Sequence, residues 1–283
     1  MQEQNGVILK IRSVYNSLTK AEKKVADYVF ENPEDIIYLS VTELAEKCGI
    51  GETTIIRFCR HIGMTGFQEL KLNMAKDIVE PETSIHESIS YDDSIPILVQ
   101  KITNENMMTL SNTVKLLSMD ALEKAVDLII NADKIEFFGV GASGYTALDA
   151  KYKFLRLGLK VDANLDAHIQ AISAVNLGER DVAVGISFSG STKDTVETCR
   201  LAKNSGAKVI CITNYARSPI TSVADIVLLT AAKETPLRSG ALTSKIAQLH
   251  LLDILYTAVA IKMRDKALQG LNKTAKAVLD KLY

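Results

Sequence analysis

The 283-residue chain contains no uninterrupted apolar run of about 18 residues, the length that a transmembrane helix requires. Its first ten residues also lack the apolar stretch of a secretory signal peptide. We therefore expect a cytoplasmic protein with no membrane partner. Internal repeats of solenoid length are missing too. With 47% hydrophobic and 24% charged residues, the chain can build one large domain or two unequal ones around buried cores.

Cysteine is scarce, with four residues in all: Cys48, Cys59, Cys199 and Cys211. No two of them form a Cys-x-x-Cys pair, and no nearby histidine completes the spacing of a zinc site. The pattern favours reduced thiols inside the core and predicts no metal site. A redox-sensing thiol is the alternative.

A strong excess of positive charge, common in nucleic-acid-binding domains, is missing. The net charge is −1, and residues 1–77 contain 10 Lys and Arg residues against 11 Asp and Glu residues. If this region binds DNA, positive charge must be local, and specificity must come from shape and base contacts. Charge alone leaves open a helical domain that binds no DNA.

Residues 1–77 have the pattern of a series of short helices. Thr19 with Glu22, and Ser40 with Glu43, form two capping boxes, in which each side chain bonds a free amide at a helix start. These helices are expected to end near residues 32 and 48. Two more are expected at about 52–62 and from residue 66 onward.

The helix at 52–62 has the pattern of a DNA-reading helix. Ile55, Cys59 and Ile62 lie at i, i+4 and i+7 and predict a buried stripe. With the preceding helix and the Gly-containing turn, it predicts a helix-turn-helix whose second helix enters the major groove. Threonine can contact a thymine methyl group, and arginine can bind guanine. The opposite face supplies the expected DNA contacts: Thr53, Thr54, Arg57, Arg60 and His61. A solvated helix face is the alternative.

A proline-containing stretch predicts a domain boundary. Residues 81–96 hold two of the five prolines, scattered Ser and Asp, and weak periodicity. We expect a DNA-binding domain at 1–77, a linker at 78–96 and a second domain at 97–283, with its core at about 120–265.

The second domain alternates helical periods with short apolar runs. Five runs are expected to form strands: 134–140, 159–161, 182–186, 209–213 and 226–229. Short β-branched runs separated by helices predict a three-layer α/β/α domain with a parallel five-stranded sheet. Ligand sites in such sheets lie beyond the carboxyl ends of the strands.

Two loops follow strands at that edge. The first, with Gly139, Gly141 and Gly144, spells the G-x-G-x-x-G fingerprint of dinucleotide sites, and Asp162 ends the next strand at a plausible distance. On these residues alone, a dinucleotide site is a serious alternative.

The second loop is rich in hydroxyl groups and leads into a helix. Free amides at a helix N-terminus, together with hydroxyl donors, suit a tetrahedral oxyanion. A dinucleotide site does not need this second loop, whereas a compact phosphorylated ligand does, with its phosphate here and its own hydroxyls near Ser143. An ordinary polar loop is the alternative. The residues of this loop that we expect to contact ligand are Ser187, Ser189, Gly190, Ser191 and Thr192.

A further polar segment follows the last strand. Glu234 could accept sugar hydroxyls, and Arg238 could meet an anion or a partner subunit. His250, placed among leucines in the next helix, is expected to be a packed rather than a catalytic histidine.

Taken together, these motifs resemble the MurR/RpiR family of bacterial transcriptional regulators, which join a helix-turn-helix to a sugar isomerase (SIS) domain. The resemblance covers nearly the whole chain. Its marks are the stretches 41–45, 55–60, 66–71, 138–143, 187–192 and 238–241, with Ser244. Gly51 departs from the family, which places Ser at the start of the recognition helix, although Gly can cap a helix at little cost.

The resemblance implies a homodimer or homotetramer that binds operator DNA and responds to a sugar phosphate. Ser143, Ser187, Ser189 and Thr192 would be the main sugar-phosphate contacts, and Gly190, Ser191, Glu234 and Ser244 the second rank. Lys71, within one family stretch, is added to the expected DNA contacts. No cofactor is implied.

Two other functions compete with a regulator. SIS domains also occur in phosphosugar isomerases, which need a base, and Glu234 or, less well placed, His168 would supply it. A redox-sensing repressor would bind a dinucleotide at the loop 139–144. A DNA-reading domain has no use in an isomerase, and the loop 187–192 has none in a dinucleotide sensor, so we expect a regulator that is not an enzyme. The sequence names neither the sugar nor the direction of the response.

Overall fold

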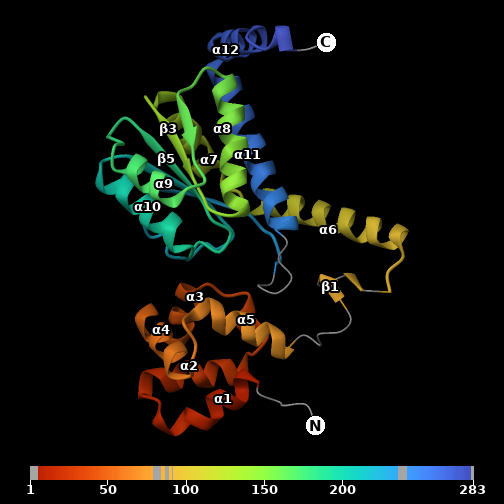
Figure 1. Cartoon of the computed structure of the whole chain (residues 1–283), viewed down its shortest axis with the longest axis vertical. Coiled ribbons are helices and arrows are strands. Elements are labelled where there is room, and N and C mark those ends of the chain that lie inside the picture. The colour runs from red at the N-terminus through yellow and green to blue at the C-terminus, as the bar shows by residue number, and fades with distance from the viewer. Residues whose placement is uncertain (1–5, 79–83, 87–88, 91, 235–240, 282–283) are drawn as a thin grey trace. The chain divides into compact units, whose positions relative to one another are not determined.

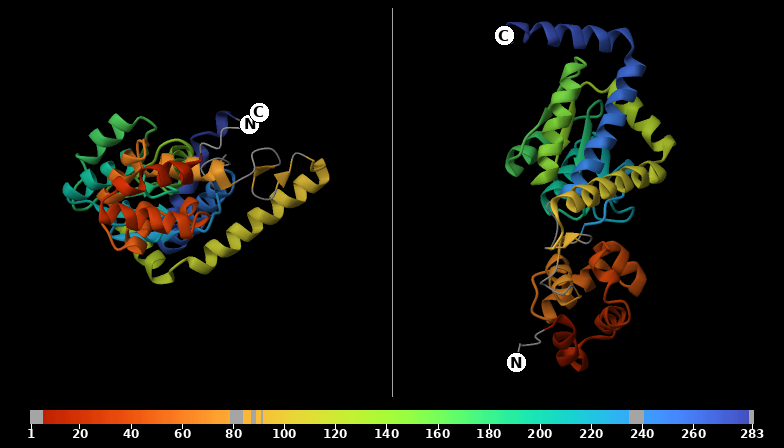
Figure 2. Two further views of the ribbon diagram at one scale, coloured as in Figure 1. Left: turned by 90° about the horizontal axis from the view of Figure 1, so that it is seen from below. Right: turned by 90° about the vertical axis from the view of Figure 1, so that its right-hand side faces the viewer.

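The computed structural model describes residues 6–78, 84–86, 89–90, 92–234 and 241–281. Two compact units divide the chain. The first comprises Met1–Glu105 with Lys233–Leu242, and the second Asn106–Ala232 with Thr243–Tyr283. The long helix α6 (Ile95–Leu116) supplies residues to both and is drawn as one unbroken helix (Figures 1 and 2).

Short helices form most of the first unit: α1 (Val7–Val14), η1 (Tyr15–Ser17), α2 (Lys20–Glu31), η2 (Asp35–Ile37), α3 (Val41–Cys48), α4 (Glu52–His61) and α5 (Phe67–Ile78). Both expected capping boxes are present, at Thr19 with Glu22 and at Ser40 with Glu43. A small hairpin follows, β1 (Ser84–His86) with β2 (Ile89–Ser90). Helix therefore occupies both ends of the segment 78–96 in which we expected a linker.

The second unit contains α7 (Met119–Asn131), β3 (Ile135–Phe138), α8 (Ala142–Arg156), β4 (Val161–Ala163), α9 (Ala167–Ala174), β5 (Val182–Ile186), α10 (Lys193–Asn204), β6 (Lys208–Thr213), β7 (Ile226–Leu229), α11 (Leu242–Met263), α12 (Asp265–Lys276) and η3 (Leu279–Lys281). All strand pairs in its five-stranded sheet are parallel. The expected fold class, a helical unit followed by an α/β unit with a parallel five-stranded sheet, is confirmed.

The strand order β4-β3-β5-β6-β7 places a switch point between β3 and β5. From β3 the chain continues to the edge strand β4, and it then returns to β5 on the other side of β3. The two loops that leave β3 and β5 therefore diverge to opposite faces of the sheet. A crevice opens between such loops, and ligands bind there in parallel α/β sheets.

Apolar side chains cover both faces of this sheet. On one face Phe137 packs against Phe154 of α8, with ring centroids 5.6 Å apart, and α7 and α11 complete the layer. On the other face Phe138 packs with residues of α9 and α10, among them Ala174 and Cys199. Figure 1 shows these helices on either side of the strands. The result is three layers, with the carboxyl ends of the strands left to loops.

By length and composition, α11 could cross a membrane. Its inner face instead belongs to the core of the second unit, because Leu251, Leu252, Leu255 and Val259 are fully buried against the sheet side. A core helix of an α/β domain passes the same test.

Candidate functional sites

The helices α3 and α4 form a helix-turn-helix. α3 ends at Gly49 in the left-handed conformation, and the Ile50 amide donates to the Ala45 carbonyl at 2.9 Å. Thr42 on α3 donates a hydrogen bond to the carboxylate of Glu52 in the first turn of α4. These bonds fix the angle at which α4 leaves the turn.

One face of α4 is buried and the other is open, as its periodicity predicts. Ile55 and Cys59 are fully buried, and Phe58, which the stripe of the sequence analysis left out, is buried with them. Thr53, Arg57 and Arg60 are exposed and Thr54 is half-buried. Among the described residues, neither arginine of α4 forms an ion pair or a side-chain hydrogen bond, so both remain available to a partner.

The side chain of His61, at the end of α4, lies beside polar side chains of the same unit. Its Nδ1 lies 3.6 Å from a carboxylate oxygen of Glu22, and its Nε2 lies 3.3 Å from the hydroxyl of Ser17. The carboxyl group of Glu22 has a lowered pKa, because bonds from Thr19 and the nearby His61 outweigh the opposing effect of burial. Contact with DNA bases was the expected role of His61, but this geometry favours an anchor between α4 and α2.

The expectation that Lys71 contacts DNA is wrong. The side chain is 4% exposed, and its ammonium donates to the carbonyl of Leu39 at 2.8 Å. Burial lowers the pKa of Lys71 to about 8, against the opposing influence of Glu43. Lys71 lies four residues after Phe67 and three before Met74, both buried, so it belongs to the inner stripe of α5. That spacing was the signal in the sequence.

The glycine loop after β3 packs tightly on itself. A Cβ atom at Gly139 would lie 2.9 Å from the Ser143 carbonyl, and one at Gly144 would lie 2.8 Å from Leu165. Two of the three fingerprint glycines therefore serve the packing of the loop. Asp162, the acidic partner that a dinucleotide would need, is paired with Lys151 at 2.6 Å. These contacts weaken the case for a dinucleotide.

The hydroxyl-rich loop after β5 forms the structure that we call the cradle, residues 187–192. Gly190 is in the left-handed conformation, and the Ile220 amide donates to its carbonyl at 2.9 Å, which ties the cradle to the neighbouring loop. Ser187 donates to the hydroxyl of Thr192 at 3.2 Å. Ser189 accepts from the Ser191 amide at 3.2 Å, so its own proton is left to donate.

The cradle ends in the N-terminus of α10. Thr192 is the N-cap residue, but its side chain makes no capping hydrogen bond, and its oxygen accepts from Ser187. The first amides of a 12-residue helix therefore lack the usual side-chain acceptor. An anion bound beside Ser189 and Ser191 would satisfy these amides and the partial positive charge of the helix end.

Ser143, in the first turn of α8, follows the neighbouring strand β3 and so lies at the same edge of the sheet. Its hydroxyl accepts a hydrogen bond from Nε2 of Gln248, on α11, at 3.3 Å. A second buried glutamine, Gln170 on α9, donates to the carbonyls of Gly139 and Asn164, both at 2.8 Å. Sequence reasoning missed both glutamines, and an amide in the buried stripe of a helix is the signal that could have found them.

The remaining residues that the sequence predicted as ligand contacts or bases lie outside the cradle. Ser244 is buried in the first turn of α11. Glu234 is buried as well, in the segment that groups with the first unit. Arg238 lies outside the described residues. His168 is exposed on α9, and His250 is half-buried on α11.

The four cysteines are all free and buried. Burial raises the pKa of Cys48 to about 11 and those of Cys59 and Cys199 to about 12, and it raises the pKa of Cys211 as well. A redox-sensing thiol needs the opposite, a lowered pKa and access to solvent. The thiols therefore act as core residues.

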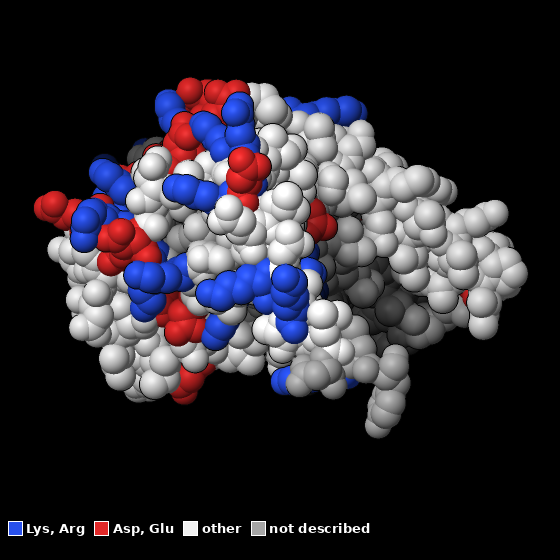
Figure 3. All heavy atoms as spheres, turned by 90° about the horizontal axis from the view of Figure 1, so that it is seen from above, with Lys and Arg blue, Asp and Glu red and all other residues white. Residues whose placement is uncertain are grey.

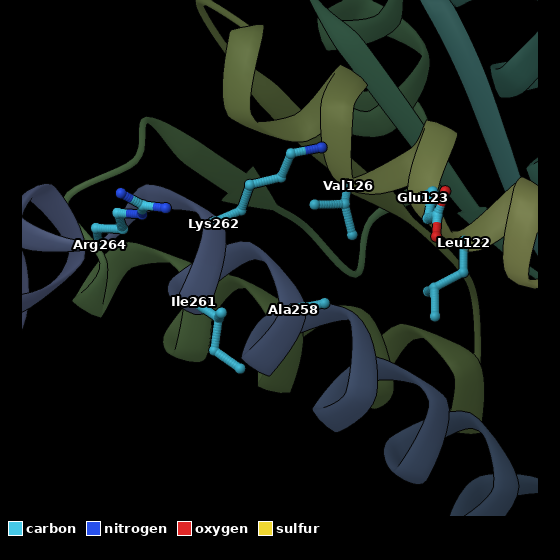
Figure 4. A pocket seen from close by; sticks show the side chains of 7 residues that line it. All are labelled: Leu122, Glu123, Val126, Ala258, Ile261, Lys262 and Arg264. Atoms are coloured by element: carbon cyan, nitrogen blue, oxygen red, sulfur yellow. The ribbon is translucent and has the colours of Figure 1, made fainter.

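Figure 3 shows Lys and Arg interspersed with Asp and Glu on one face, in keeping with the net charge of −1. A hollow of about 630 Å³ lies between α7 and α11, and Leu122, Val126 and Ala258 are among the residues that line it (Figure 4). Ala258 is ten residues beyond Gln248, or about 15 Å along the helix, so this hollow is separate from the contact between Gln248 and Ser143.

Comparisons with known proteins match both halves of the chain. Residues 5–81 match the family model described as the helix-turn-helix domain, rpiR family, and residues 128–258 match the SIS domain. An uncharacterized HTH-type transcriptional regulator of Caldanaerobacter subterraneus is 42% identical over 96% of each chain. The HTH-type transcriptional regulator HexR of Pseudomonas aeruginosa is 36% identical over 91% of this chain and 90% of its own.

Among solved structures, the NanR protein of Vibrio vulnificus, complexed with ManNAc-6P, is similar over nearly its full length. Its TM-score is 0.87, with 27% sequence identity, and the similarity covers 98% of this chain and 99% of that one.

Proposed function

The chain belongs to the rpiR family of helix-turn-helix transcriptional regulators that carry a SIS domain, and we propose that a sugar phosphate bound at the cradle controls its binding to operator DNA. The observation that carries this proposal is the cradle itself. Hydroxyl groups and uncapped helix amides converge at the β3/β5 switch point, where a parallel sheet binds its ligand. The bound ManNAc-6P of the similar NanR protein supports a ligand of this class.

In this proposal the phosphate accepts hydrogen bonds from the cradle. Ser187, Ser189 and Thr192 are its main hydroxyl contacts, and the backbone at Gly190 and Ser191 lies against it. Ser143 then faces the sugar, because it follows the adjacent strand β3. Glu234 and Ser244 are proposed as outer contacts to sugar hydroxyls.

DNA binding is proposed for the open face of α4. Arg57 and Arg60 would contact bases or phosphates, and Thr53 and Thr54 would contact base edges. A small helical unit with no excess of positive charge has little electrostatic affinity of its own. We therefore propose that two or four copies act together on paired half-sites, in the cytoplasm of a bacterial cell.

We also propose that the chain binds its ligand without converting it. An isomerase needs a base close to C1 and C2 of the sugar. The relatives named HexR are transcriptional regulators, which supports binding without conversion.

The test begins with operator sequences selected from random duplexes by the full-length protein. Glucose 6-phosphate, glucosamine 6-phosphate, ribose 5-phosphate, 6-phosphogluconate, N-acetylmannosamine 6-phosphate and NADH are then added one at a time. One sugar phosphate is expected to change operator affinity and, at 100 times its Kd, to stabilise the fold by about 2.7 kcal/mol. NMR of the sugar is expected to show no conversion. A response to NADH alone, or turnover of a sugar phosphate, would refute the proposal.

A further inference from the structure

Gln248 is an isolated polar side chain in an apolar helix face. It is 2% exposed, and its neighbours on the inner face of α11, Ala247, Leu251 and Leu252, are fully buried. A buried amide is unfavourable unless both of its ends find hydrogen-bond partners. An apolar residue would pack here with a smaller desolvation cost. The reason for an amide must therefore lie in the partners of its oxygen and its nitrogen.

Both ends of the amide are used, and both point to α8. Thr146 donates to Oε1 of Gln248 at 3.2 Å, and Nε2 of Gln248 donates to the hydroxyl oxygen of Ser143 at 3.3 Å. The bonds join residues more than 100 positions apart in the sequence. Thr146 is itself fully buried, and its one proton is shared between Oε1 of Gln248 and the carbonyl of Ala142, each 3.2 Å from the hydroxyl oxygen.

The order of donors along this chain has a consequence for Ser143. A hydroxyl group carries one proton and two lone pairs. Because the Gln248 amide donates to Ser143, one lone pair of the serine is occupied and its proton is not drawn toward α11. The proton can then point to a third partner, and a run of aligned hydrogen bonds strengthens the last one.

We propose that Gln248 is a positioning residue for the effector, which holds Ser143 so that its hydroxyl donates to an oxygen of the bound sugar phosphate. This inference rests on the proposed function of the cradle. Gln248 itself does not contact the ligand. Its effect passes through Ser143, and the ligand atom at Ser143 is an acceptor, such as a sugar hydroxyl or carbonyl oxygen.

A double-mutant cycle in the full-length protein tests this role. The probe is the strongest binder among the sugar phosphates named above, and its Kd is measured for wild type, Ser143→Ala, Gln248→Met and the double variant. Each single change is expected to weaken binding roughly 5- to 10-fold, about the value of one hydrogen bond. The double variant is expected to match Ser143→Ala alone, because residues that act through one contact are not additive.

The inference would be overturned if the increase in Kd of the double variant equalled the product of the two single increases. An unchanged Kd for Gln248→Met would overturn it as well. Gln269→Met, the same exchange on the exposed face of α12, is the matched control and is expected to leave the Kd unchanged. If Gln248→Met does not fold, Thr146→Val replaces it as the test, because this change removes the hydroxyl that donates to Oε1. Thr146→Val is expected to weaken ligand binding less than Ser143→Ala does. Added to Ser143→Ala, it is expected to leave the Kd unchanged.

Gln248→Glu adds a readout that a packing role would not move. An ionised carboxylate only accepts, so it would take the Ser143 proton away from the ligand, whereas a protonated carboxyl group can donate to Ser143 as the amide does. The ratio of the variant's Kd to that of wild type is therefore expected to fall as the pH is lowered from 8 to about 5.5. A ratio independent of pH would contradict the inference. If no probe binds wild type, or if Ser189→Ala does not change the Kd, the proposed function itself fails. These outcomes differ from those that contradict only the role of Gln248, so the two failures are distinguishable.

Discussion

The ammonium of Lys71 donates a hydrogen bond to the carbonyl of Leu39, at 2.8 Å, inside the helical unit. Leu39 directly precedes Ser40, the N-cap of the first helix of the helix-turn-helix. A charge that sequence reasoning assigned to DNA thus fixes the backbone at the start of α3. Buried lysines are rare unless they are paired, and this one has a specific acceptor.

This burial makes stability depend on pH. The pKa of Lys71 is about 8 in the folded protein and near 10.5 when unfolded, so between these values the unfolded state binds more protons. The contribution of Lys71 to stability is therefore least favourable below pH 8 and improves as the pH increases through this window, by about 3 kcal/mol at most. The buried thiols, whose pKa values are raised, oppose this change above about pH 9 in wild type and variants alike. Urea unfolding of wild type and Lys71→Met at several pH values checks this. The stability of Lys71→Met relative to wild type is expected to fall through this window, whereas that of Lys76→Met, a change at an exposed position of the same helix, is expected to stay level.

Arg57 is expected to contact a base directly. It is exposed on α4 beside the buried Phe58, and among the described residues it has no intramolecular bond to break. Arg57→Ala is expected to weaken binding to the selected operator by about 1–3 kcal/mol and to reduce discrimination between operators. Binding measured on operator and random duplexes separates the two effects. Equal losses on both would mean that Arg57 contacts only the phosphate backbone.

Operator half-sites are expected to lie about one helical turn apart, or a multiple of it, if the binding units act in pairs as proposed. Inserting about 5 base pairs between the half-sites turns one of them to the far side of the duplex. The affinity is then expected to fall on the order of 100-fold, and inserting about 10 base pairs is expected to restore part of it. Insensitivity to the spacing would indicate that each unit binds alone.

Ser189 is expected to donate its proton to the phosphate, since its oxygen already accepts from the Ser191 amide. Ser189→Ala is expected to weaken sugar-phosphate binding roughly 10- to 100-fold, the value of a hydrogen bond to a charged group. Operator titrations at several ligand concentrations should then show that the variant needs more ligand for the same response. Ser222→Ala, at an exposed serine, is the control. A wild-type response in Ser189→Ala would mean that the cradle is not the sensor.

Gly190 is expected to tolerate no side chain. Its φ is +62°, and a Cβ atom would lie 2.1 Å from the hydroxyl of Ser218 and 2.6 Å from its Cβ. Gly190→Ala is expected to lower stability by about 1–3 kcal/mol from backbone strain alone and to displace the cradle. Thermal unfolding and ligand titration measure both effects. Gly178→Ala, where the nearest atom would be 3.8 Å from the new Cβ, is expected to have little effect.

Local chemistry let the sequence determine a large part of this protein. The capping boxes at Ser40 and Thr19 depend on residues three positions apart, so their pattern predicts the starts of α2 and α3 without knowledge of the rest of the chain. The strands β5 and β7 lie where their apolar runs predict, because a buried parallel strand is apolar on both faces. The four hydroxyl residues of the cradle likewise lie within six positions of the sequence.

Only the tertiary structure decided which partners the buried polar groups have. Ser143 and Gln248 meet across 105 positions, and the bond of Lys71 to Leu39 spans 32. The helical stripe can indicate that such a side chain is buried, but it does not indicate which distant residue the side chain meets. The packing of the glycine loop against Leu165, and the partners of His61, were decided in the same way. The sequence thus determined which elements form and which chemistry they carry, and long-range packing decided which side chains are free to meet DNA or a ligand.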